Sequence, residues 1–273
     1  MTEYHFQTPQ PVSLYVETGK GTVRVNATDT TETHVQVTGR DADQVRVEQA
    51  GDQITVVAPQ RTGFLSGDSR LDVAVTIPTD SDLAVKTGSA DITVDGTLGS
   101  GKIKSGSGDV QLDTFGGPAL VDTGSGDIRL EEALAELRIK SGSGSVNLGS
   151  VASSVAVSTG SGDVEIAHAA GPTVVKTGSG DLKVVEAQDD ISLTTGSGDL
   201  LIGTAQRGRL TAKGASGDVR VGIPAGVPVW TDLSTLSGEI HSNLRGAGEP
   251  REGADHVELR AKTVSGDILL TEV

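Results

Sequence analysis

The sequence predicts an all-β fold, a single-stranded β-helix (β-solenoid) with 18-residue coils. One Gly-rich phrase recurs at a constant spacing, with its last residue at positions 91, 109, 127, 145, 163, 181 and 199. Within each repeat, apolar residues alternate with polar ones, which is typical of half-buried strands. Aromatic residues make up only 2% of the chain, and 37 residues are Gly. We therefore expect a core of stacked small aliphatic columns instead of bulky side chains.

The Gly-rich phrase predicts a tight corner between two short strands. Its commonest form is TGSGD, with TGSAD and SGSGS as variants. Glycine suits such a corner because the backbone there either takes φ > 0 or crowds against the neighbouring coil, where a Cβ would clash. A phosphate-binding loop would lead into a helix, so no nucleotide site is predicted. The phrase ends at Asp91, Asp109, Asp127, Ser145, Asp163, Asp181 and Asp199.

Five columns of residues are expected to face the core, and the one eight residues before the Asp is Leu83, Gly101, Ala119, Leu137, Val155, Thr173 and Ile191. One unit cannot bury its apolar face alone, so equivalent residues of successive coils stack at roughly 4.8 Å intervals. Six residues before the Asp, the column reads Val85, Ile103, Val121, Ile139, Val157, Val175 and Leu193. Columns of aliphatic residues also lie one and three positions after the Asp, beginning at Ile92 and Val94. A column of smaller residues follows at Thr97, Phe115, Ala133, Val151, Ala169, Ala187 and Ala205.

The N-terminal part departs from this period. Residues 16–25 reproduce the corner with Thr22 in place of Asp, and alternating segments between 33 and 78 predict further strands. We expect an irregular β layer here, which would cap one end of the solenoid and carry a flexible loop at Arg61–Ser69.

The C-terminal part keeps the corner but lengthens the coils. The corner recurs at Asp218, Glu239 and Asp267, so that the spacing between corners grows to 19, then to 21 and then to 28 residues. The longest insertion, Ser242–Asp255, is rich in Gly and charge and predicts an exposed loop. Trp230 is expected to plug the C-terminal end. We predict one domain over 1–273, with an irregular N-terminal layer (1–82), regular coils (83–219) and looped C-terminal coils (220–273).

These motifs resemble a known bacterial family. The repeated phrase hxVxTGSGDhxh follows an xVxIP segment at Val75–Pro78 and precedes VGIPAGVPVWTDLSTLSGEI at Val221–Ile240. Over essentially the whole chain, this pattern is similar to the "putative adhesin" domain of unknown function, a toast-rack-related group of single-stranded β-helices. The resemblance implies a link by association to envelope-stress systems, and it carries over no catalytic residue.

The most regular polar feature of the repeat is a column of aspartates. Stacked carboxylates roughly 5 Å apart repel one another unless they are compensated. We interpret the column as a structural corner cap, in which Asp accepts turn N–H groups and a lysine column at Lys86, Lys104, Lys140 and Lys176 supplies opposite charge. The alternative is a metal-binding stripe, which Ser145 would interrupt. The column is Asp91, Asp109, Asp127, Asp163, Asp181, Asp199 and Asp218.

A second polar column lies at the end of each preceding strand. Because its Thr and Ser residues share the parity of the core columns, we expect their hydroxyls to bond to the corner backbone of the same or the adjacent coil. An ice-binding role is not predicted, since the outward rows are chemically mixed. The column is Thr87, Ser105, Thr123, Ser141, Thr159, Thr177 and Thr195.

Several related architectures fit less well. Hexapeptide acyltransferase helices place an aliphatic residue at every sixth position, and calcium-binding rolls need two Gly-rich corners where each repeat here has one. The five histidines, His5, His34, His168, His241 and His256, are scattered without catalytic or metal-ligand spacing. We therefore predict a protein that is not an enzyme and that has no cofactor and no metal.

Composition narrows the expected partners. The net charge of −15 disfavours nucleic acid and anionic lipid, and no segment is long enough to enter a membrane. The absence of Cys and of a basic, apolar leader favours a cytoplasmic location. We predict a rod-like scaffold or protein-interaction module, with an unknown protein partner and a setting in an envelope-stress or regulatory assembly. The alternatives are a bactofilin-like filament that self-associates through solenoid ends, and a carbohydrate-binding or adhesin module.

Overall fold

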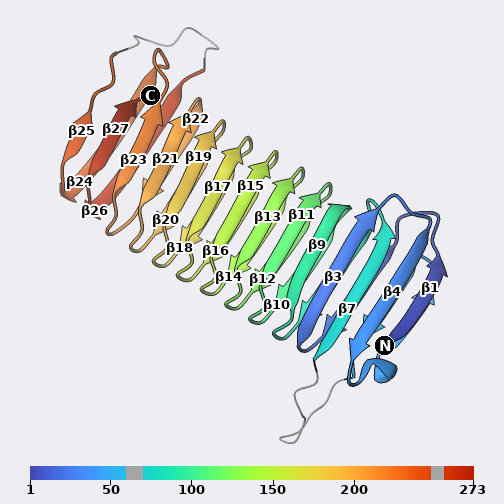
Figure 1. Cartoon of the computed structure of the whole chain (residues 1–273). Coiled ribbons are helices and arrows are strands. Elements are labelled where there is room, and N and C mark those ends of the chain that lie inside the picture. The colour runs from blue at the N-terminus through green and yellow to red at the C-terminus, as the bar shows by residue number, and fades with distance from the viewer. Residues whose placement is uncertain (60–69, 247–254) are drawn as a thin grey trace, which may run out of the picture. The chain divides into compact units, whose positions relative to one another are not determined.

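The computed structural model describes residues 1–59, 70–246 and 255–273 (Figure 1). It divides into two compact units, Met1–Glu136 and Leu137–Val273, each described here by itself. The described residues form β-strands and one short 3₁₀ helix, η1 (Ala42–Gln44), which confirms the predicted all-β class. The loop expected at 61–69 lies outside the described residues, as do residues 247–254 of the loop expected at 242–255. The single-domain division stays a prediction.

The N-terminal unit consists of two sheets that face each other across the core. The first sheet has the order β1-β4-β7-β3-β9-β11-β13, and the second β12-β10-β8-β2-β6-β5. The strands of the first are β1 (Thr2–Gln7), β3 (Gly21–Thr28), β4 (Glu32–Gly39), β7 (Leu71–Pro78), β9 (Asp91–Leu98), β11 (Val110–Phe115) and β13 (Ile128–Ala133). Those of the second are β2 (Ser13–Thr18), β5 (Arg46–Ala50), β6 (Gln53–Val57), β8 (Asp82–Thr87), β10 (Gly101–Ser105) and β12 (Ala119–Thr123).

The C-terminal unit repeats this two-sheet plan. Its first sheet has the order β15-β17-β19-β21-β23-β27-β25, and its second β24-β26-β22-β20-β18-β16-β14. The strands of the first are β15 (Val146–Val151), β17 (Val164–Ala169), β19 (Leu182–Ala187), β21 (Leu200–Ala205), β23 (Val219–Ile223), β25 (Ile240–Ser242) and β27 (Ile268–Glu272). Those of the second are β14 (Leu137–Ser141), β16 (Val155–Thr159), β18 (Thr173–Thr177), β20 (Ile191–Thr195), β22 (Gly208–Lys213), β24 (Val229–Ser237) and β26 (Val257–Ser265).

The predicted stacking of aliphatic columns is confirmed by the strand register. Ile103 pairs with Val85 on one side and with Val121 on the other, each one repeat away along the chain, in parallel strands. All three side chains are at most 2% exposed. Strict alternation places every second residue of a strand in the core, so the 18-residue repeat sets which residues of both strands in each coil face inward.

A β-bulge corrects one predicted column. Gly96 has φ of +89°, and the register of β9 against β11 shifts beside it. As a result Leu98, and not Thr97, pairs with Phe115 in the small-residue column. The bulge moves every later side chain of β9 by one position, which sequence spacing alone does not reveal.

The corner glycines are required by crowding. A Cβ built on Gly162 would lie 2.0 Å from the carbonyl oxygen of Gly144 in the neighbouring coil. Gly180 meets the oxygen of Gly162 in the same way, at 2.1 Å. Positive φ is not the reason at these two corners, although Gly217 and Gly266 of the last coils have φ of +141° and +145°. Of the two explanations offered by the sequence, close approach between coils is therefore the one that applies to the regular array.

The N-terminal layer is β structure, as expected, but part of it is antiparallel. β4 pairs antiparallel with both β1 and β7, and β5 pairs antiparallel with β6. The corner at 16–25 joins β2 to β3, and Thr22 is in register with Asp91, as its place in the motif predicts. That this layer caps the core stays a prediction.

The coils at the end of the C-terminal unit are not stacked in sequence order. β26 lies between β22 and β24, and β27 lies between β23 and β25. The last coil in the sequence is therefore an interior coil, and the earlier β24–β25 coil is outermost in its unit. The expectation that Trp230 plugs the end is wrong. Trp230 alternates with inward-facing Val229 and Thr231, so it lies on the outer face of β24 and is 52% exposed.

Candidate functional site

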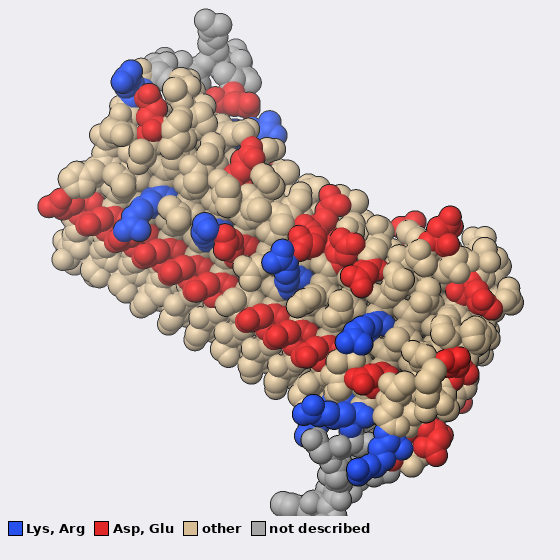
Figure 2. Space-filling view, viewed as in Figure 1, with Lys and Arg blue, Asp and Glu red and all other residues tan. Residues whose placement is uncertain are grey.

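The aspartates of the corner phrase form a hydrogen-bonded row in each unit, visible as lines of red carboxylates in Figure 2. In the regular array, where two successive corners both end in Asp, the backbone N–H of the later Asp donates to Oδ1 of the earlier one; Ser145 interrupts this series before Asp163. The distance is 3.1 Å from Asp109 to Asp91, and 2.8 Å from Asp199 to Asp181. The remaining donor–acceptor pairs are Asp127 to Asp109, Asp181 to Asp163, Asp218 to Asp199, Asp267 to Asp218, and Glu239 to Asp267.

These bonds explain how the row tolerates its like charges. Each accepting carboxylate receives a backbone donor that has no partner within its own coil, and a charge-assisted bond of this kind is stronger than a neutral one. The row also follows the spatial order of the coils, since it passes from Asp218 to Asp267 and only then to Glu239. Acceptance of main-chain N–H groups makes each carboxylate a coil-to-coil clamp.

The prediction that the lysine column pairs with the aspartate column is wrong. Lys86 donates to Oε1 of Glu17 at 2.8 Å, and not to a corner aspartate. Within the described ranges, no ion pair joins Lys104, Lys140 or Lys176 to the row. The physical reason is the corner itself, because the lysines lie on strands of the second sheet whereas the aspartates open strands of the first. Asp218 of the row instead pairs with Arg220, at 2.6 Å.

The Thr and Ser column bonds to the corner backbone of its own coil. Ser105 Oγ donates to the carbonyl of Gly108 at 3.0 Å and accepts from the Gly108 N–H at 3.1 Å. Thr159 Oγ1 accepts from Gly162 N–H at 3.0 Å. The hydroxyls thus stabilise the turn of their own coil from its buried side. Of the two arrangements that the sequence left open, bonding within the same coil is the one observed.

One corner of the C-terminal unit is left incomplete. The N–H of Gly198 donates to the carbonyl of Ser216 in the next coil, and no longer to the Thr195 hydroxyl. Thr195 Oγ1 is buried and has no partner among the described residues. A small cleft opens beside it, lined by Gly214 and Lys213 among others. The next coil, which ends at Asp218, is one residue longer than the regular coils, and its Ser216 carbonyl takes the Gly198 N–H.

Large apolar side chains are exposed on the outermost coils of the C-terminal unit. They include Trp230 at 52%, Leu236 at 84% and Val264 at 54% exposure, together with Ile240 and Leu269. The guanidinium carbon of Arg260 lies 5.4 Å from the Trp230 ring centroid, within cation–π range. Because β24 and β25 each pair on one side only within the described structure, this coil also presents a sheet edge.

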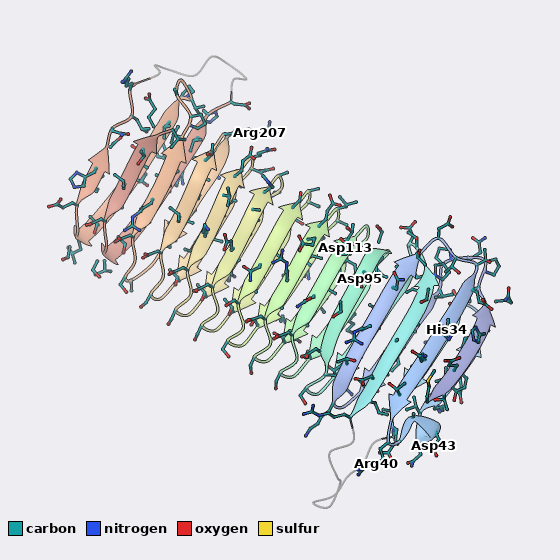
Figure 3. The ribbon with its side chains drawn as sticks, in the orientation of Figure 1. His34, Arg40, Asp43, Asp95, Asp113 and Arg207 are labelled. Atoms are coloured by element: carbon teal, nitrogen blue, oxygen red, sulfur yellow. The ribbon has the colours of Figure 1, made fainter. Side chains whose placement is uncertain are left out.

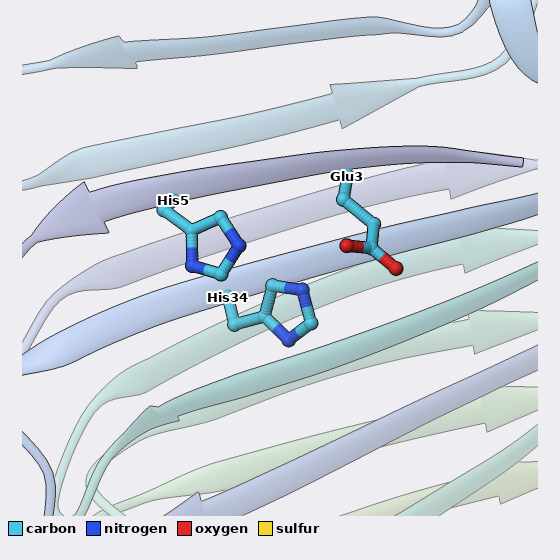
Figure 4. Close-up of side chains that lie close together, drawn as sticks. All are labelled: Glu3, His5 and His34. Carbon is cyan, nitrogen blue, oxygen red and sulfur yellow. The ribbon is translucent and has the colours of Figure 1, made fainter.

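Histidines that are far apart in the sequence meet on the N-terminal unit. His34 is labelled on β4 in Figure 3, and Figure 4 shows it beside His5 and Glu3 of β1. The two imidazole rings are stacked, with centroids 4.4 Å apart and planes inclined by 17°. The potential ligand atoms of the three side chains all lie within 4.8 Å of one another. Sequence spacing missed this cluster because antiparallel β1–β4 pairing creates it, although His5 and His34 both occupy outward positions of alternating segments.

Two other histidines each lie beside a carboxylate. His168 Nδ1 lies 3.1 Å from Glu186, and His241 Nε2 lies 2.7 Å from Glu239. The pKa of Glu186 is lowered by hydrogen bonds from Gln188 and then from His168. Neither pair gathers a second histidine.

Comparison with known proteins agrees with the fold. The chain belongs to the Toastrack DUF4097 family, whose model matches residues 12–271. It is similar to the crystal structure of a "putative adhesin" from Parabacteroides merdae, with 14% identity, 99% of this chain and 96% of that chain covered, and a TM-score of 0.51. At that identity, the likeness shows a shared fold alone.

Two further solved structures are more distant. A "putative adhesin" from Bacteroides fragilis is 12% identical over 98% of this chain and 96% of that chain, with a TM-score of 0.45. A "putative lipid binding protein" from Parabacteroides distasonis is 13% identical over 97% and 96%, with a TM-score of 0.38. Comparison with curated proteins gives no match. Over the described ranges, no helix has both the length and the apolar character needed to span a membrane.

Proposed function

We propose that this protein is a non-enzymatic scaffold and protein-interaction module whose partner binds at the outermost β24–β25 coil of the C-terminal unit. The observation that carries this proposal is the concentration of exposed apolar side chains there. Six of the eleven large hydrophobic residues that are exposed in the described structure lie between positions 230 and 273: Trp230, Leu236 and Ile240 on this coil, Val264 and Leu269 on the neighbouring β26–β27 coil, and Val273 after it. Clustered apolar exposure beside polar residues is typical of protein-binding surfaces.

The backbone of the same coil supports binding by strand addition. β24 is a nine-residue strand and pairs only with β26 in the described structure, which leaves one row of N–H and C=O groups open to a partner. Ile240 faces the core side of β25 but is 45% exposed, because the described residues place no further coil over it. A partner strand would pair with the edge and cover this side chain.

The filament alternative is supported less well. End-to-end growth of a parallel solenoid needs two matching edges. The described outer strands of the N-terminal unit, β1 and β5, are antiparallel to their neighbours, and they carry charged residues such as Glu3, Arg46 and Glu48. Charged edge strands of this kind oppose sheet-to-sheet growth.

The proposed setting rests on composition and on the family. A chain with a net charge of −15 favours a basic or neutral protein partner over nucleic acid. We propose a cytoplasmic location and a role in a bacterial envelope-stress or regulatory assembly, the latter on the family resemblance alone.

Site-specific photo-crosslinking tests this function. A photo-reactive residue at Leu236 should give a discrete crosslinked partner in the native cell, whereas the same residue at Val174 should not. Val174 is a matched control because it is 39% exposed on β18 of the same unit. Leu236→Asp should abolish binding of that partner to the purified chain and leave the melting temperature unchanged.

Three outcomes would contradict the proposal. These are equal crosslinking at both positions, retention of the partner by Leu236→Asp, and crosslinks to further copies of the chain only. In the last case, sedimentation velocity should show oligomers that Leu236→Asp dissolves, and the filament alternative would replace the proposal.

A further inference from the structure

We propose that Glu3, His5 and His34 form a binding site for a divalent transition-metal ion of the Zn²⁺ class. The site lies on the outer face of the N-terminal unit and is independent of the function proposed above. Strand pairing places its residues, because His5 is directly opposite His34 across β1 and β4, and Glu3 is two residues from His5 on the same face. β4 is held on both sides, since His34 is also in register with Thr76 of β7.

The distances between the side chains are compatible with one ion. Ligand nitrogens lie about 2.0–2.1 Å from Zn²⁺, so neighbouring ligand atoms of a tetrahedral site are separated by about 3.3 Å. The three potential ligand atoms lie within 4.8 Å of one another. Glu3 and His5 are exposed on the surface and can close this difference by side-chain rotation, which requires no movement of the strands.

A buried nitrogen without a partner points to a ligand. Nε2 of His34 is inaccessible to solvent and has no hydrogen-bond partner among the described residues. A buried polar atom left unsatisfied is unfavourable, and the lone pair of a neutral imidazole is a common metal ligand. Coordination of an ion by Nε2 would satisfy this atom.

Neighbouring side chains orient the other two ligands. Gln36 Nε2 donates to Oε1 of Glu3 at 3.0 Å. Nδ1 of His5 lies 3.9 Å from Oε1 of Glu32, which also accepts a hydrogen bond from Gln7. Glu32 thus lies on the Nδ1 side of the His5 ring, beyond hydrogen-bond distance, and Nε2 of His5 is the nitrogen left to coordinate. Rotation of the exposed His5 side chain would bring Nδ1 and this carboxylate into the outer-sphere contact that is usual for metal-bound histidine.

The ligand types select the class of ion. Two imidazoles and one carboxylate suit Zn²⁺, Co²⁺ or Ni²⁺, whereas Ca²⁺ and Mg²⁺ prefer oxygen ligands alone. An ion here would connect β1 to β4 through side chains. Since β1 pairs with β4 alone in the described structure, the ion would hold an edge strand in place.

Metal titration of the full chain without a polyhistidine tag tests the site. We expect one equivalent of Zn²⁺ by calorimetry and visible d–d absorption with Co²⁺, both saturable. His34→Gln and His5→Gln each remove a direct ligand. Each should weaken the affinity by more than about 100-fold, because loss of an outer-sphere partner alone already costs up to about that factor. His168→Gln is the matched control and should bind like wild type, because it removes a histidine from a pair with a single carboxylate.

A second readout separates metal binding from a structural effect. Zn²⁺ should slow amide hydrogen exchange in β1 of wild type and of His168→Gln, but not of His5→Gln. His5 is 55% exposed, so its replacement keeps the test available if His34→Gln unfolds. Absence of saturable binding to wild type, or wild-type affinity in His5→Gln, would overturn the proposal and leave the cluster as a packed histidine pair beside Glu32.

Discussion

Gly162→Ala tests whether close approach between coils controls the stability of the regular array. Gly162 is buried at the corner between β16 and β17. The added Cβ would lie 2.0 Å from the oxygen and 2.8 Å from the carbon of the Gly144 carbonyl, and 3.1 Å from Thr159 Oγ1. Ordinary contact begins near 3.4 Å, so one coil must move by more than 1 Å relative to its neighbour.

The expected loss of stability is about 3 kcal/mol. Overpacking typically costs about 1–3 kcal/mol, and the upper end applies because the obstructing atoms are backbone and cannot turn away. The displacement also weakens the 3.0 Å bond from Gly162 N–H to Thr159 Oγ1, which is worth about 1 kcal/mol. For a unit of this size, a loss of about 3 kcal/mol lowers the melting temperature by about 6–12 °C.

Differential scanning calorimetry of Gly162→Ala and Ser161→Ala measures this effect. Ser161 is the next residue back in the same corner and is exposed, so its replacement should change stability by at most about 0.5 kcal/mol. If Gly162→Ala melted within about 2 °C of wild type, the corner would have room for a side chain. The repeated glycines would then need another explanation.

Four further outcomes follow from individual contacts, one of them the 2.6 Å hydrogen bond from Arg209 to Glu258. Ile139 is 1% exposed and stacks on Val157, so Ile139→Asp would bury a carboxylate and should lower stability by several kcal/mol in urea melts. Lys140→Ala, on the outer face of the same strand, should be nearly neutral. Equal shifts for the two variants would contradict the register. Asp181→Ala should cost about 1 kcal/mol in the same assay through loss of its bond from the Asp199 N–H, and Asp181→Asn, which keeps the acceptor oxygen, should cost less; the reverse order would refute the clamp. Melting temperatures in millimolar calcium and in excess chelator should agree, and a large saturable rise with calcium would make the Asp row a ligand stripe. The pKa of Glu258 is held below its ordinary value, chiefly by the hydrogen bond from Arg209 and also by Arg260. The carboxylate therefore stabilises the fold above the ordinary Glu pKa, and this contribution is lost as pH falls through the lowered pKa. Glu258→Gln should reduce the acid-induced drop in melting temperature, and an unchanged drop would count against this pair.

Much of the fold could be predicted because one local rule generates it. The alternation of an inward aliphatic residue such as Ile103 with outward neighbours such as Lys102 and Lys104, repeated from coil to coil, determines both the strands and their inward faces. The same rule failed where the period is broken within a strand. At Gly96 a bulge replaces Thr97 by Leu98 in the core. An isolated Gly within a strand is a local signal for such a bulge, but the regular 18-residue spacing concealed it.

The features of the candidate sites were harder to predict because they depend on which strands pair. His5 and His34 lie in segments that each read as an alternating strand, and only the antiparallel register of β1 and β4 brings them together. Trp230 was misplaced for a related reason. The sequence suggested a terminal plug from its position near the end, but the parity of β24 turns the side chain outward. Lys86 likewise shares a column with other lysines, yet its partner is Glu17 on the adjacent strand β2.

The interior position of β26 and β27 has a consequence for how the chain folds during synthesis. The ribosome completes β22 to β25 before β26 and β27 have been made, so the neighbour that β24 and β25 have in the finished structure does not yet exist. Growth from the N-terminus by addition of one coil after another therefore stops at β23. Pairing can resume only when β26, which ends at residue 265, has been made and can add to β22. β24 and β25 then pair last, although they are made earlier. We expect these steps to be slower than addition of a regular coil, because non-local strand pairing closes a larger loop.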